Sequence, residues 1–146
     1  MKTLFASVAL LLVLVGASLA GCGTTQTPSN STSSLQTITI TLTDAEVTAS
    51  QTTFRLGEGY HFMVTNRGTR PHQFWLMPQG MAQMMNDMPM AQWHQHVMFS
   101  TQDIGPGMMS TADYTFTNAM MHQQLAFGCY TANGQVIREM PIHMSQ

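Results

Sequence analysis

Short alternating segments dominate the chain from residue 35 onward. From Leu35 to Thr43 apolar residues alternate with threonines, and this period of two predicts a half-buried strand. Later segments rich in aromatic and β-branched residues are separated by glycine, proline and asparagine, which is typical of strands joined by turns. The further predicted strands are Phe54–Leu56, Tyr60–Thr65, His72–Met77, Tyr114–Thr117, Leu125–Tyr130 and Pro141–Met144. About seven strands indicate an all-β fold, an antiparallel Greek-key β-sandwich.

One stretch interrupts this pattern. Residues 79–99 carry several methionines at spacings of three and four, followed by Trp93. Such spacing is typical of helical turns rather than of strands. We therefore expect an irregular, partly helical, methionine-rich insert in the sandwich.

The first residues have the layout of a secretory signal. Lys2 supplies a positive start, and Leu4–Val15 is almost wholly apolar but shorter than the roughly 20 residues of a membrane span. The following Leu-Ala-Gly-Cys ends at Cys22 and resembles the bacterial lipobox. We expect residues 1–21 to be a signal peptide and Cys22 to be lipidated; the alternative is an ordinary secretory signal with a chance cysteine.

The segment after the signal has the composition of a linker. Residues 22–36 are rich in serine and threonine and nearly free of apolar side chains, which is typical of a flexible tether. Residues 37–146 would then form one domain, held at a membrane surface by the lipid. This organisation predicts an extracytoplasmic lipoprotein and leaves open the periplasmic face and the cell surface.

Composition narrows the classes of function. Only five residues are lysine or arginine, and the formal net charge is −2, which excludes a nucleic-acid binder that neutralises phosphates. The chain has no Ser-His-Asp arrangement with local support and no glycine-rich phosphate loop, so we do not expect an enzyme. The unusual feature is the presence of 15 methionines, thirteen of them after His72.

The two cysteines have different expected roles. If Cys22 is lipidated, Cys129 stands alone. A lone thiol outside the cytoplasm is open to oxidation. Cys129 is therefore either an inert buried residue of a strand or a thiolate protected by a metal.

Four segments form a further pattern: Asn66-Arg67-Gly68-Thr69-Arg70-Pro71-His72-Gln73-Phe74, the Pro106-Gly107 turn before Tyr114-Thr115-Phe116, Phe127-Gly128-Cys129-Tyr130, and Met140. Together they resemble the corresponding segments of cupredoxins, the small extracytoplasmic copper-binding β-sandwiches. The resemblance covers roughly residues 36–146 and implies a copper site with His72, Cys129 and Met140 as ligands. Cupredoxins usually have a second histidine three to five residues after the cysteine, and this chain has none there. The next is His143, which we expect as the fourth ligand, with Gln135 as a possible oxygen donor instead.

The missing imidazole bears on function. A blue-copper site holds copper between two histidines and a cysteine thiolate, with a weak axial methionine, whereas a His, Cys, Met set is softer and favours Cu(I). The resemblance thus implies a copper-binding protein in copper handling or electron transfer, with a redox or copper-transfer protein as partner. The alternative is a cupredoxin-like module that has lost copper and binds a partner protein.

The methionine-rich segment has two interpretations of its own. Thioethers select Cu(I), so Met77–Met98 is a candidate accessory site. Methionine also fills irregular gaps in a core, which makes packing or an apolar partner surface the competing interpretation. Within this segment His94-x-His96 has the spacing to bind Cu(II) if it is extended.

Overall fold

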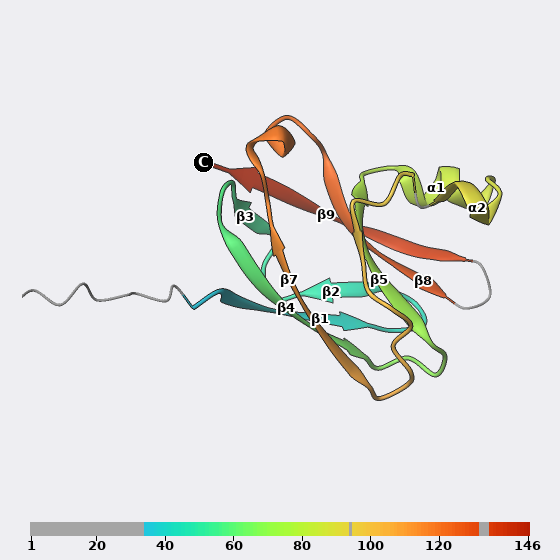
Figure 1. The fold of residues 1–146 in the computed structure, drawn as a ribbon. Helices are drawn as coiled ribbons and strands as arrows, with labels where there is room; N and C mark the ends of the chain where they lie inside the picture. The colour runs from blue at the N-terminus through green and yellow to red at the C-terminus, as the bar shows by residue number, and fades with distance from the viewer. Residues whose placement is uncertain (1–33, 94, 132–134) are drawn as a thin grey trace, which may run out of the picture. The chain divides into compact units, whose positions relative to one another are not determined.

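Nine strands form two facing sheets in the part of the chain that the computed structural model describes, residues 34–93, 95–131 and 135–146 (Figure 1). One sheet has the order β2-β1-β4-β7 and the other the order β3-β9-β8-β5-β6. The strands are β1 (Gln36–Leu42), β2 (Val47–Ala49), β3 (Thr53–Arg55), β4 (Gly59–Asn66), β5 (His72–Pro78), β6 (Phe99–Ser100), β7 (Met109–Thr115), β8 (Leu125–Thr131) and β9 (Val136–Ser145). The predicted β-sandwich is confirmed.

Two pairs of neighbouring strands depart from the predicted antiparallel arrangement. β1 pairs with β4, and β3 with β9, in parallel, whereas the other pairs are antiparallel. In both parallel pairs the partners are not consecutive in the chain, so a crossover brings the second strand back in the same direction. Both sheets are therefore mixed.

The main core lies between the two sheets. Along β4 every second residue is buried, and β1 buries Ile38, Ile40 and Leu42. Aromatic rings fill the centre: Phe54 stacks on Phe116 with ring centroids 4.7 Å apart. Five phenylalanines are completely buried there, namely Phe54, Phe62, Phe74, Phe116 and Phe127. The alternation seen in the sequence thus separates a core face from a solvent face.

A second, smaller core lies on the outer face of the β5–β8 pair. Helices α1 (Met81–Asn86) and α2 (Met90–Trp93) cover this face, as Figure 1 shows. Its buried members are Trp75, Met77, Met81, Met85, Trp93 and Tyr130. The predicted partly helical insert is confirmed. None of the helices in the described ranges has the length and apolar character that a membrane crossing requires.

Strand β8 is enclosed on both faces as a result. All seven of its residues are buried. On the outer side, a Cβ atom at Gly128 would lie 2.0 Å from the terminal methyl group of Met77, which would have to shift to make room for it. β8 is the strand that carries Cys129.

Candidate metal centre

The backbone fixes His72 at the first position of β5. Its N–H donates to the carbonyl of Ile104 at 3.0 Å, and the N–H of Ile104 donates back at 2.8 Å. The turn that follows uses Pro106 and Gly107, whose φ of 72° favours glycine. Because Phe74 faces the core, His72, two residues earlier, does so as well, and its side chain has no exposed surface.

The Asn66–Gly68 segment forms the loop beside this imidazole. The side-chain amide of Asn66 donates to the carbonyls of Arg70 and Ile104, both at 2.7 Å, and its oxygen accepts from the N–H of Gly68 at 2.8 Å. A Cβ atom at Gly68 would lie 2.5 Å from Nε2 of His72. Asparagine thus closes the loop, and glycine lets its backbone approach the ring, which explains this part of the sequence motif.

Asp44 holds the other side of the imidazole. Its Oδ1 lies 3.0 Å from Nε2 of His72, and its Oδ2 accepts from the hydroxyl and the amide of Thr69 at 2.7 and 2.9 Å. These hydrogen bonds, first the hydroxyl of Thr69, lower the pKa of Asp44 to about 2. An ionised carboxylate only accepts hydrogen bonds, so Nε2 carries the proton and donates it. No motif marks Asp44 in the sequence, and the prediction of site residues missed it.

The second nitrogen of the same ring is unpartnered. Nδ1 of His72 is buried and has no hydrogen-bond partner among the described residues. Buried polar atoms in native proteins are nearly always paired, so this one calls for a physical explanation. In the tautomer that carries its proton on Nε2, Nδ1 has a lone pair. A carboxylate on one ring nitrogen and a free lone pair on the other is the arrangement of metal-binding histidines.

Cys129 lies on the neighbouring strand with its side chain in the same core. In the β5–β8 register Cys129 is opposite Phe74, and His72 is opposite Thr131. Cys129 and His72 are therefore diagonal neighbours on one face, with Cα atoms about 7–8 Å apart. Burial, aided by the charge of Asp44, raises the pKa of the Cys129 thiol to about 12. The thiol is completely buried and is present as SH at neutral pH.

Met140 lies next to Cys129 but not next to His72. It is opposite Phe127 in the β8–β9 register and packs, partly buried, against the main core. From His72 it is two strands across and four residues along, which corresponds to about 16 Å between Cα atoms. The structure therefore brings Met140 near the thiol but does not bring it together with the imidazole.

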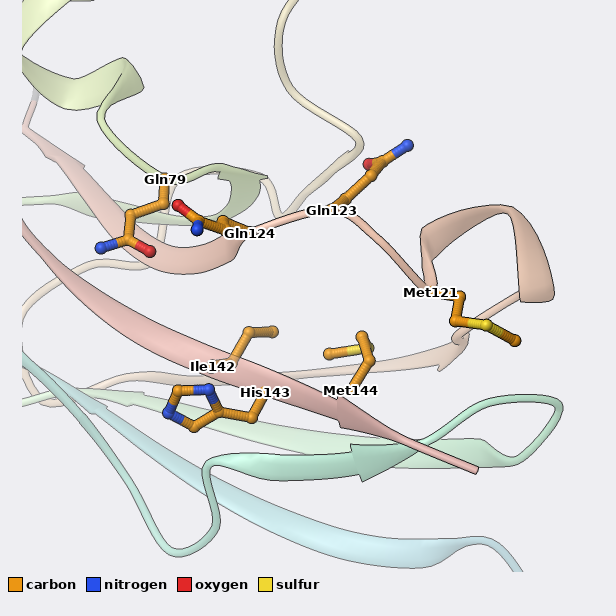
Figure 2. A pocket seen from close by; sticks show the side chains of 7 residues that line it. All are labelled: Gln79, Met121, Gln123, Gln124, Ile142, His143 and Met144. Carbon is orange, nitrogen blue, oxygen red and sulfur yellow. The ribbon is translucent and has the colours of Figure 1, made fainter.

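His143 lies farther away, and its side chain is exposed. It pairs with Thr53 of β3, six residues beyond the position opposite Cys129, or about 20 Å along β9. Figure 2 shows it on the opposite side of β9 from Ile142 and Met144, at a surface hollow of about 200 Å³. The structure thus separates His143 from His72 and Cys129, because β9 runs on as a strand instead of folding back.

Gln135 is hydrogen-bonded to the end of β8. The N–H of Thr131 donates to the carbonyl of Gln135 at 3.0 Å, and the side chain of Gln135 is exposed. Residues 132–134 lie outside the described residues. Within the described part of the chain, no three His, Cys, Asp or Glu side chains gather as a metal site.

The methionine-rich segment is largely explained by packing. Met77, Met81 and Met85 are buried in the second core, where Trp75 stacks on Tyr130 with ring centroids 5.1 Å apart. Met84 is exposed. His94 lies outside the described residues, so the His94-x-His96 hypothesis stays a prediction.

The chain is similar to known proteins in its three-dimensional structure. No family model and no curated protein matches the chain. Among solved structures it is similar to the Na-dithionite-reduced auracyanin of the photosynthetic bacterium Roseiflexus castenholzii, at 17% identity and a TM-score of 0.51. It is also similar to an azurin (Az-iso2) of the obligate methylotroph Methylomonas sp. strain J, at 12% identity and a TM-score of 0.51. Each match covers 76% of this chain and 98% of the other protein, and both of those proteins are cupredoxins. The domain formed by the described residues therefore has the cupredoxin fold.

Proposed function

We propose that this protein binds copper as Cu(I) through His72 and Cys129 and acts in copper handling outside the cytoplasm. The unpartnered Nδ1 of His72 carries the proposal, because it is a buried lone pair one diagonal step from a buried thiol. The cupredoxin fold supports copper as the metal. A bound copper ion would stabilise the negative charge of the Cys129 thiolate, which could then exist in the interior.

The donor set supports Cu(I) rather than a blue-copper centre. An imidazole and a thiolate, without a second imidazole, form a soft pair suited to Cu(I). Three residues would have defined roles in binding the ion. Cys129 would give up its proton, His72 would present its lone pair, and Asp44 would fix the tautomer of His72. Met140 is a further soft donor beside Cys129 but beyond the reach of an ion that also contacts His72.

Two other functions rest on specific observations. Electron transfer is the activity that the cupredoxin family implies, and the rigid sandwich suits it. A partner-binding module that has lost copper is favoured by the lack, in the described ranges, of three clustered His, Cys, Asp or Glu side chains.

The proposal includes lipidation of Cys22, which would anchor the domain to a membrane. Cys22 lies outside the described residues, and its lipidation rests on the lipobox resemblance. A flexible tether of 12 residues, Gly23–Ser34, would have an r.m.s. length of roughly 20 Å between the lipid and the domain. Mass spectrometry of the mature protein tests this, since lipidation would add acyl groups to an N-terminal Cys22.

Copper binding separates the three functions. The purified protein is titrated with Cu(I) in competition with a chromophoric chelator, and separately with Cu(II). We expect one Cu(I) bound more tightly than any other. This tight binding is lost in Cys129→Ser and in His72→Gln, while His143→Gln leaves its affinity unchanged. An intense thiolate-to-Cu(II) charge-transfer band, absent in Cys129→Ser, would instead favour electron transfer. A failure to bind either ion would leave the partner-binding module.

A further inference from the structure

The outer face of the β2-β1-β4-β7 sheet carries a line of metal-binding side chains that the interior pair does not use. Along β4 the buried residues alternate with His61, Met63 and Thr65, which therefore lie on the outer face. Helices α1 and α2 pack on the other sheet. The side chains on this outer face are thus available to a ligand from solution.

A carboxylate holds His61 in place. Asp113 is directly opposite His61 in the β4–β7 register, and its Oδ1 lies 2.5 Å from Nδ1 of the imidazole. The His61 side chain is 36% exposed, and its Nε2 has no hydrogen-bond partner within the described ranges. As at the interior histidine, one ring nitrogen is oriented by a carboxylate while the other is unpartnered. Here the side chain is partly exposed to solvent.

Two thioethers continue the line from His61. Met63 is two residues along the same face, with Cα atoms about 7 Å apart. Its neighbours in register are Thr39 on β1 and Thr111 on β7, and both of these have short side chains. Met109 is the diagonal neighbour of Met63 across β4 and β7 and is 53% exposed. Its Cα atom lies about 14 Å from that of His61, too far for the two side chains to share one ion.

We propose that His61 and Met63 form a surface site for Cu(I). Thioether sulfur selects Cu(I), and imidazole binds it alongside sulfur. Thioethers carry no proton to lose, so this site avoids the deprotonation that Cys129 requires. Asp113 acts as a positioning residue that orients the imidazole. The proposal does not depend on the interior pair, which lies in the core of the sandwich.

The test uses a His72→Gln/Cys129→Ser background, so that the interior pair makes no contribution. The protein, labelled with ¹³C at its methionine methyl groups, is titrated with Ag(I), a redox-inert substitute for Cu(I), and followed by NMR. We expect the methyl signal of Met63 to shift within the first equivalent. His61→Ala should weaken this binding at least about tenfold, and Asp113→Asn about 10–100-fold.

Matched controls make the result decisive. His122→Ala removes another exposed histidine and should leave the titration unchanged. The methyl signal of the exposed Met84 should move only at higher Ag(I) concentrations. If Met84 and Met63 shift with the same midpoint, or if His61→Ala has no effect, the methionines bind silver without a built site and the proposal is wrong. Binding in this background also keeps the result separate from the fate of the proposed interior site.

Discussion

The pH dependence of stability provides a direct test of the Cys129 environment. Burial raises the pKa of this thiol in the folded protein to about 12, from an ordinary value of 9.0. Below pH 9 the thiol is protonated in both the folded and the unfolded chain, so the stabilisation is complete there. Between pH 9 and 12 only the unfolded chain loses the proton, and the free energy of unfolding therefore falls as the pH rises.

The two pKa values set the size of the effect. Each pH unit above 9 lowers the free energy of unfolding by about 1.4 kcal/mol, which gives about 2 kcal/mol at pH 10.5. Burial also raises the pKa values of Tyr60, Tyr114 and Tyr130, which titrate at alkaline pH as well. A comparison with Cys129→Ala cancels these tyrosines, because they contribute to both proteins.

Urea unfolding at pH 8 and pH 10.5 provides the measurement. The truncated side chain in Cys129→Ala leaves a cavity whose cost is nearly the same at both pH values, so only the change with pH is compared. We expect the native protein to lose about 2 kcal/mol more stability than Cys129→Ala between these two pH values. Equal losses would refute the reasoning, since they would mean that the thiol ionises as easily in the folded protein as in water.

Three further predictions concern the surroundings of His72 and the second core. Asp44→Asn should weaken Cu(I) binding about 10–100-fold in the chelator competition, because the amide no longer enforces a proton on Nε2 of His72. Gly68→Ala should cost about 1–3 kcal/mol in urea unfolding, since its Cβ would lie 2.5 Å from the same ring nitrogen. Met85→Ala should cost about 2–5 kcal/mol, whereas the adjacent, exposed Met84→Ala should stay within about 0.5 kcal/mol; similar losses for the two methionines would contradict the second core.

The strands that bury one face could be predicted from the sequence. β1 and β4 alternate regularly, and their bounds come within two residues of the prediction. β2 and β6, of three and two residues, are too short to show a period, and pairing with a neighbour defines them. The parallel pairs also escaped prediction, because pattern alone does not say which strands become neighbours.

The site could be predicted in part. His72 and Cys129 lie in recognisable motifs, and the structure brings both to one face of β5 and β8. Asp44 lies 28 residues before His72 and meets it only through the fold. His143 has the right chemistry, but its position depends on how far β9 continues as a strand, which its sequence does not reveal.

The enclosure of β8 has a consequence for rates. Side chains of the main core cover one face of the strand, and the helical insert covers the other. An ion bound at Cys129 would therefore exchange with solvent only when the covering structure opens locally. The residence time of such an ion would then be set by the frequency of local opening rather than by the strength of its bonds. Such a site would exchange its ion slowly even where its affinity is modest.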